Sequence, residues 1–102
     1  MNFWLKRVSS PKTYKDGTVI WLRRDRTKHR NGDDPACEFC DGAKQWFKNG
    51  KLHRDKGPAC VYPDGALEWW FEGEKHRDLP DPACEYPDGS VEYWVHGVKH
   101  KP

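Results

Sequence analysis

Residues 62–77 read Tyr-Pro-Asp-Gly-Ala-Leu-Glu-Trp-Trp-Phe-Glu-Gly-Glu-Lys-His-Arg, and variants of this phrase recur along the 102-residue chain. Its fixed positions are an Asp-Gly pair, an aromatic residue, a second Gly, and a His followed by a basic residue. Three copies begin at the pairs Asp41-Gly42, Asp64-Gly65 and Asp88-Gly89. In each, the second Gly lies 8 residues after the first Gly, and the His lies 11 residues after it. A longer copy opens at Asp16-Gly17 and has Asp25 near the place of its second Gly.

The spacing of the copies predicts a repeat array. Successive Asp-Gly pairs are 25, 23 and 24 residues apart, and a fixed period in this range is typical of stacked repeats rather than of globular enzymes. The linkers that end the first three copies carry Pro-Ala-Cys, at Pro35–Cys37, Pro58–Cys60 and Pro82–Cys84. We expect an N-terminal capping segment at 1–13, with Phe3-Trp4-Leu5 as a candidate covering strand, because terminal units of arrays are usually atypical. The four repeats then span 14–38, 39–61, 62–85 and 86–102.

Turn residues and strand formers predict the secondary structure. Pro63-Asp64-Gly65 and Pro87-Asp88-Gly89 are turn sequences, in which Pro presets one dihedral angle and Gly supplies a positive φ. A β-rich run of about six residues follows each turn and ends at the second Gly. The 9 Gly and 8 Pro leave no segment long enough for a sizeable helix. The sequence therefore predicts an all-β array of about four stacked β-hairpin repeats, which form a continuous antiparallel meander sheet.

Alternation along the expected strands sorts the aromatic residues into two columns, one on each face of the sheet. The first column holds Trp21, Trp46, Trp69 and Tyr93, and the second holds Leu22, Phe47, Trp70 and Trp94. Apolar neighbours accompany the first column, which we expect to be the packed face. The wetter second column is accompanied by Gln45, Glu68 and Glu92. It is either a partner-binding stripe or a cross-strand ladder that only stabilises the sheet.

Composition is typical of a soluble chain with a thin core. The sequence is 35% hydrophobic and 33% charged, has a mean hydropathy of −1.09, and yet carries 6 Trp. No apolar run approaches the ~20 residues of a membrane span. Lys6-Arg7 follows Phe3-Trp4-Leu5, the reverse of the order in a secretory signal. We therefore expect a cytoplasmic protein of one domain whose cysteines stay reduced.

The segment from Trp46 to Arg54, Trp-Phe-Lys-Asn-Gly-Lys-Leu-His-Arg, resembles the MORN repeat, in which an aromatic residue is followed by Asn-Gly, Lys and His-Gly. The fuller pattern, from Tyr-Pro-Asp-Gly through Trp, Gly and His-Arg to Gly-Pro-Ala, is similar to the variant MORN repeats of small bacterial and viral proteins. This resemblance covers about residues 14–102. Arg or Lys follows the His where MORN repeats have Gly. The resemblance implies stacked β-hairpins and a binding role, and brings no shared catalytic motif.

A basic pair recurs in register, as His29-Arg30, His53-Arg54, His76-Arg77 and His100-Lys101. We expect a column along one edge of the array, with Arg30, Arg54, Arg77, His53 and His76 as candidate phosphate or anion ligands. Beside aromatic residues, such a column makes a nucleic-acid or nucleotide binder the alternative function. The formal net charge of only +2 disfavours this alternative. The competing interpretation is that each His hydrogen-bonds a turn in its own repeat and each Arg pairs with a repeat Asp.

The cysteines support two interpretations. Cys37 and Cys40 have the spacing of half a zinc site, which Cys60 and a His such as His53 would complete. However, Cys37, Cys60 and Cys84 recur at the repeat period, and Cys40 stands where the other copies have Pro. We therefore favour a stacked column of small, half-buried side chains, with no metal and no cofactor.

The distribution of reactive residues argues against an enzyme. Cys, His and Asp are spread over repeated positions, whereas catalysis needs a single constellation, usually in a cleft. We expect a non-catalytic protein-binding module, and one candidate role is a phage or bacterial inhibitor that blocks a larger host protein. The expected partner is a host protein or another copy of the chain. The candidate partner-binding residues are Phe47, Trp70, Trp94, Glu68 and Glu92.

Overall fold

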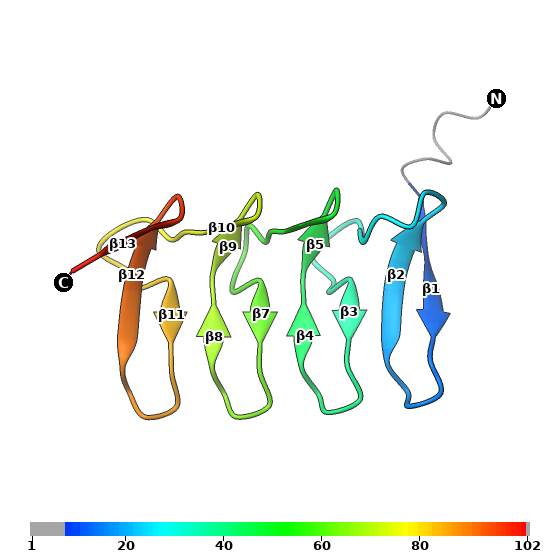
Figure 1. Ribbon diagram of the computed structural model, residues 1–102, viewed down its shortest axis with the longest axis horizontal. Coiled ribbons are helices and arrows are strands. Elements are labelled where there is room, and N and C mark those ends of the chain that lie inside the picture. The colour runs from blue at the N-terminus through cyan, green and yellow to red at the C-terminus, as the bar shows by residue number, and fades with distance from the viewer. Residues whose placement is uncertain (1–7, 102) are drawn as a thin grey trace.

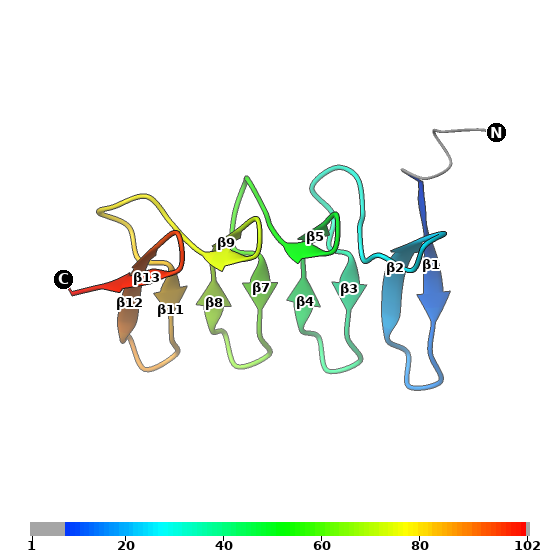
Figure 2. The ribbon, with the colours of Figure 1, turned by 45° about the horizontal axis from the view of Figure 1, so that its top comes forward.

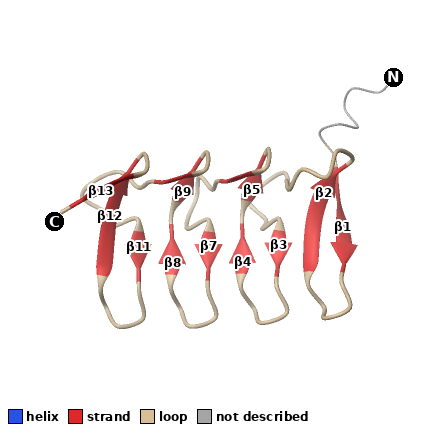
Figure 3. Ribbon diagram, in the orientation of Figure 1, coloured by secondary structure: helices blue, strands red, loops and turns tan. Residues whose placement is uncertain are grey.

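The computed structural model describes residues 8–101, which form strands and turns without a helix (Figures 1 and 3). Nine strands make one antiparallel sheet in the order β1-β2-β3-β4-β7-β8-β11-β12-β13. The predicted all-β meander of hairpins is confirmed. The sheet strands are β1 (Ser9–Thr13), β2 (Val19–Arg23), β3 (Cys37–Glu38), β4 (Lys44–Gln45), β7 (Cys60–Val61), β8 (Leu67–Glu68), β11 (Cys84–Glu85), β12 (Val91–Val95) and β13 (Val98–His100).

The Asp-Gly pairs close the hairpins along one edge of the sheet. In the third copy the Gly65 amide donates to the Tyr62 carbonyl at 3.0 Å, and the Ala66 amide donates to the Asp64 carboxylate at 2.9 Å. Gly65 has a φ of +96° and Gly89 a φ of +88°, a region that only Gly occupies at low cost. The expected turn chemistry is therefore confirmed.

The strands expected after these turns are interrupted in the middle copies. In the third copy, the chain leaves the main sheet at Trp69 and continues as β9 (Trp70–Phe71), which pairs with β10 (Glu74–Lys75). The amide of Trp69 donates to the linker residue Ala83 at 2.7 Å, while its carbonyl accepts from the His76 amide at 3.0 Å. Because this residue is shared between two partners, the strand bends there. The second copy has the same arrangement, with β5 (Phe47–Lys48) and β6 (Lys51–Leu52).

A second set of hairpin turns, at residues 23–28, 48–51, 71–74 and 95–98, lies side by side along the opposite edge (Figure 2). We call these four turns the hairpin row. In each of the last three turns, a glycine amide donates a hydrogen bond to a carbonyl of the hairpin before it. Gly50 donates to Lys28, Gly73 to Leu52 and Gly97 to Lys75, at 2.8–2.9 Å. The row is therefore a continuous structure, and the whole array measures 50 × 30 × 17 Å.

Apart from Trp46, the hydrophobic core of the described residues is made of Ala and Cys side chains. Cys37, Cys60 and Cys84 are 0–1% exposed, and the Ala before each of them is fully buried. Each Cys occupies a linker strand with a neighbouring strand on both sides, and Cys60 pairs with Gln45 and Glu68 in register. The three cysteines are thus fully buried, not half-buried as expected, because each strand that carries one has a neighbour on both sides.

The two aromatic columns differ less in burial than expected. Trp46 is 6% exposed and is the only buried Phe, Tyr or Trp within 8–101. The other aromatic members of both columns are half-buried: Trp21, Trp69 and Tyr93 in the first, and Phe47, Trp70 and Trp94 in the second. The expectation of a packed first face therefore holds for Trp46 alone. A single sheet has no second layer to cover the rest.

The N-terminal segment caps the array through β1, which pairs with β2 over five residue pairs. This strand lies within the expected capping segment at 1–13. The candidate strand Phe3-Trp4-Leu5 lies outside the described residues. Over residues 8–101 there is no helix that is long and apolar enough to cross a membrane.

Candidate functional site

The arginines of the basic column lie over the first aromatic column. Three guanidinium groups stack on tryptophan rings at 3.9–4.0 Å from the ring centroid: Arg30 on Trp21, Arg54 on Trp46 and Arg77 on Trp69. Each also donates through Nη1 to the proline carbonyl of its own linker, at 3.1–3.2 Å. Stacking of this kind is favourable because the cation faces the negative face of the ring. The arginines therefore cover the first face and fix the linkers to it.

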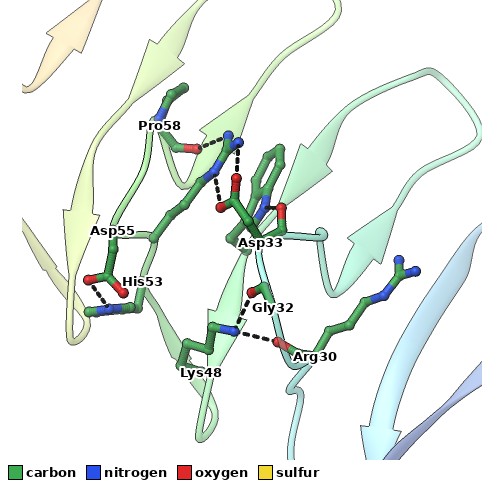
Figure 4. A network of polar contacts seen from close by, with 9 residues as sticks. Arg30, Gly32, Asp33, Lys48, His53, Asp55 and Pro58 are labelled. Carbon is green, nitrogen blue, oxygen red and sulfur yellow. Dashed lines mark hydrogen bonds and ion pairs between the residues drawn. The ribbon is translucent and has the colours of Figure 1, made fainter.

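The carboxylate partner of each arginine depends on the residue that follows the buried Cys. Arg30 pairs with Glu38 at 3.5 Å, and Arg77 pairs with Glu85 at 3.1 Å. In the second copy this position is Val61, and Arg54 instead makes a two-bond contact with Asp33 of the preceding linker, at 2.9 and 3.1 Å (Figure 4). Hydrogen bonding from Arg54 holds the pKa of Asp33 below its usual range.

The linker at residues 30–34 is fixed to the second repeat by further contacts. The Trp46 indole donates to the Asp33 carbonyl at 2.9 Å. Lys48 Nζ donates to the carbonyls of Arg30 and Gly32 at 2.6 and 2.7 Å, beside the Arg54–Asp33 pair (Figure 4). These bonds satisfy backbone groups of a loop that has no strand partner. The loop therefore lies against the first face, on the side of Trp46.

The histidines connect each repeat to the next one. Nδ1 of the ring accepts from the amide of a turn residue in the following copy: Asn49 to His29, Glu72 to His53 and His96 to His76, at 2.9–3.0 Å. Nε2 contacts Asn31, Asp55 or Asp78 in the linker of the same copy, at 2.7–3.1 Å. An acceptor at Nδ1 assigns the neutral tautomer with the proton on Nε2. Burial, with Arg23 and Lys48 nearby, lowers the pKa of His29 and favours its neutral form.

These contacts alter the picture expected for the basic column. The competing interpretation places each His on a turn of its own repeat; Nε2 does bond the linker of the same repeat, whereas Nδ1 bonds the turn of the next repeat. Arg30, Arg54, Arg77, His53 and His76 do lie in a column, and their polar atoms contact the protein's own linkers and turns. At the end of the column, His100 and Lys101 are exposed. The candidate anion ligands are thus already engaged within the fold.

A second polar network holds the aromatic side chains of the opposite face. Glu68 Oε1 accepts from the Tyr62 hydroxyl at 3.0 Å and from the Trp70 indole at 3.1 Å. Lys75 Nζ lies 3.8 Å from the other carboxylate oxygen of Glu68 and 5.0 Å from the ring centroid of Trp94. The third repeat therefore holds the indole of its own Trp70 and also places Lys75 over the Trp94 ring of the next repeat.

The fourth repeat builds the same network. Glu92 Oε1 accepts from the Tyr86 hydroxyl at 3.2 Å and from the Trp94 indole at 3.0 Å. Lys99 Nζ donates to the other oxygen at 3.3 Å, and the Trp94 bond holds the pKa of Glu92 below its ordinary value. In the second repeat the corresponding ring is Phe47, with Lys28 Nζ 4.9 Å from its centroid.

The candidate partner-binding residues are thus brought together on one face. Phe47, Trp70 and Trp94 lie in successive repeats, with Glu68 and Glu92 beside the two tryptophans. Sequence reasoning missed the clamping residues Tyr62, Tyr86, Lys75 and Lys99. We call Phe47, Trp70 and Trp94, with the two glutamates and Lys75, the aromatic stripe.

The cysteines that were candidate metal ligands differ in burial and do not form a common site. Cys37 and Cys60 lie in the buried column, whereas Cys40 is exposed and its Sγ lies 3.6 Å from Asp16 Oδ2. Over residues 8–101, no group of three or more His, Cys, Asp and Glu side chains is arranged to hold a metal ion. Burial raises the pKa of the Cys60 thiol to about 12 and also raises the pKa values of Cys37 and Cys84.

Native protein treated with iodoacetamide at neutral pH is expected to be alkylated at Cys40 alone. The thiolate is the reactive form, and burial both shields the three column cysteines and keeps them protonated. Peptide mass spectrometry before and after denaturation gives the measurement, and denatured protein serves as the fully labelled control. Alkylation of Cys60 at the rate of Cys40 in folded protein would contradict the buried column.

Comparison with protein-family models, curated proteins and solved structures finds no match to this chain.

Proposed function

We propose that this chain is a non-catalytic protein-binding module, a MORN-like repeat array that contacts its partner through the aromatic stripe. The observation that carries the proposal is the fixed, half-exposed geometry of Trp70 and Trp94. Each indole is hydrogen-bonded to a glutamate, and Lys75 lies over both rings at 5.8 and 5.0 Å from their centroids. A phage or bacterial inhibitor of a larger host protein is the biological role that we propose for such a module.

Fixed aromatic side chains favour binding because less side-chain entropy is lost when a partner docks. Tryptophan and tyrosine are also the residue types that dominate interface energies. The stripe runs over successive repeats, so its rings have the spacing of the repeats themselves. An aromatic surface that extends over several repeats suits the surface of another protein better than a small molecule, which needs a concave pocket.

The nucleic-acid alternative has less support. Arg30, Arg54 and Arg77 already donate to linker carbonyls and stack on indole rings. Phosphate binding would have to compete with these contacts. We therefore do not propose it as a second function.

The double substitution Trp70→Ala/Trp94→Ala is expected to abolish capture of a partner protein by the immobilised chain. Loss of hot-spot aromatic residues costs about 2 kcal/mol or more each, which is over ten-fold in affinity. The measurement is quantitative mass spectrometry of proteins retained from a bacterial lysate, followed by titration of the retained protein. Circular dichroism at the binding temperature confirms that the variant is folded.

Val91→Ala is the matched control, because Val91 is 42% exposed and pairs with Glu85 on the face opposite the stripe. It should bind as the parent chain does. Equal retention by the double variant would contradict the proposal. So would retention that depends on nucleic acid and disappears after nuclease treatment, since protein interfaces respond weakly to salt and nucleases.

A further inference from the structure

The charge of the hairpin row changes sign between its second and third turns. Its first two turns carry Arg24, Arg26, Lys48 and Lys51, and its third turn carries Glu72 and Glu74. The chain as a whole shows the same division, since nine of the 16 acidic residues follow residue 61, against four of the 18 Lys and Arg. We call this change of sign the charge step. Two copies of the row that lie antiparallel would place the basic turns of each against the acidic turn of the other.

The side chains at the step are held in place by the next turn in the row. The stem of Lys51 packs against Gly73, and Glu74 packs against Gly97. Glycine is required at both positions because φ is +85° and +79°. The charged groups therefore project from fixed points on neighbouring turns.

An apolar surface lies between the two charges. Phe71 is 37% exposed, and its ring centroid lies 4.6 Å from that of His53 and 6.0 Å from that of His76. The His76 ring stacks on His96 at 4.0 Å. Beside them a shallow hollow is lined by Lys48, Asn49, Lys51, His53 and Glu72. The row thus has an aromatic centre with opposite charges on its two sides, which is the usual composition of a protein interface.

The charges at the step have few partners of their own. Within residues 8–101, no hydrogen bond or ion pair engages the side chains of Arg24, Lys51 or Glu72. Glu74 lies 3.8 Å from Nδ1 of the exposed His96. These groups can therefore form contacts with another molecule without first breaking strong contacts in the fold.

We propose that the hairpin row binds a second copy of this chain, in antiparallel orientation, about a two-fold axis between its second and third turns. Lys51 of each copy then faces Glu72 and Glu74 of the other, and the two Phe71 rings lie near the axis. Each contact occurs twice, as in any isologous dimer. The contacts of this dimer are made by Lys51, Phe71, Glu72 and Glu74, none of which belongs to the aromatic stripe.

Salt dependence is the first property to measure. Exposed charge pairs are screened by salt, so association should weaken when ionic strength rises from about 0.02 M to about 0.5 M. Sedimentation velocity over a concentration series gives the dimerisation constant at each salt concentration. A chain that stays monomeric at low salt and at the highest concentration measured overturns the proposal.

Paired charge reversals test the orientation. Lys51→Glu and Glu74→Lys should each weaken dimerisation at least roughly ten-fold, because each change places like charges together twice in the symmetric dimer. An equimolar mixture of the two variants should form heterodimers again, since Glu at 51 then faces Lys at 74, and Lys at 51 faces Glu at 74. A mixture that stays monomeric, or single variants that dimerise as the parent does, overturns the proposal.

Controls separate this effect from folding and from net charge. Lys44→Glu and Asp81→Lys change the net charge by the same amounts at exposed positions off the row, and they should dimerise like the parent chain. The neutral pair Lys51→Gln and Glu74→Gln disturbs packing least. Each neutral variant should weaken dimerisation, and their mixture should recover only part of it, because the heterodimer keeps one of the two Lys51–Glu74 pairs. Equal weakening by the two control reversals would show a general charge effect and overturn the proposal.

Discussion

Trp46→Ala is expected to lower the free energy of unfolding by about 3–5 kcal/mol, the range for truncating a large buried aromatic residue. Trp46 is 6% exposed, stacks on Arg54 at 3.9 Å, and donates from its indole to the Asp33 carbonyl at 2.9 Å. The substitution removes the largest core side chain and leaves both partners without their contact. Most small domains are stable by only about 5–15 kcal/mol, so the variant loses a large share of its stability.

Urea unfolding followed by circular dichroism gives the measurement, and Tyr93→Ala is the matched control. Tyr93 occupies the same column in the last repeat but is half-buried, so its truncation should cost clearly less. Losses of equal size in the two variants would show that burial in the middle of the array does not determine the importance of this column.

His53→Ala is expected to cost about 2–3 kcal/mol, because a ring that packs against Phe71 is lost and the Glu72 amide loses its acceptor. The loss of stability should also differ between the repeats before His53 and those after it. His53 connects the second repeat to the third, and repeat arrays are stabilised by nearest-neighbour contacts. Weakening this connection should separate unfolding of residues 62–101 from that of residues 8–61.

Hydrogen exchange measures this separation residue by residue. The Glu72 amide should lose protection first, and amides of the third and fourth repeats should then exchange faster than those of the first. Asp55→Asn is the matched control, because Asn31 contacts the His29 ring in the same way in the first repeat. An unchanged Glu72 amide in His53→Ala would contradict the role assigned to the ring.

Local chemistry made much of the fold predictable. Turns depend on a few neighbouring residues, so Asp64-Gly65 and its equivalents located the β1–β2, β3–β4, β7–β8 and β11–β12 hairpins of the main sheet. The bend at Trp69 was not predictable from alternation, which assumes a straight strand with one partner on each side. The His53–Glu72 bond was missed for a related reason, since its partner is fixed only once the repeats are stacked.

Part of the aromatic network could have been found by comparing the copies with one another. The third and fourth repeats have Tyr, Glu and Trp at the same offsets, as Tyr62, Glu68 and Trp70, and as Tyr86, Glu92 and Trp94. The second repeat has Phe39, Gln45 and Phe47 at these three places. Loss of the hydroxyl, the charge and the indole together indicates that the three side chains form one unit. The structure joins them through the glutamate in both repeats that retain it.

The joints between successive repeats are built from one recurring set of three hydrogen bonds. The backbone amide of a turn glycine donates to the carbonyl of the residue before the His, and the amide of the residue before that glycine donates to Nδ1 of the His ring. The backbone amide of the Arg that follows the His donates to the carbonyl of an aromatic residue in the next copy. Successive repeats therefore join through the same donor and acceptor groups at each of these joints. The molecule is modular: one internal unit could be duplicated or removed while these three hydrogen bonds re-formed at each joint, so the length of its surfaces can change in steps of one repeat.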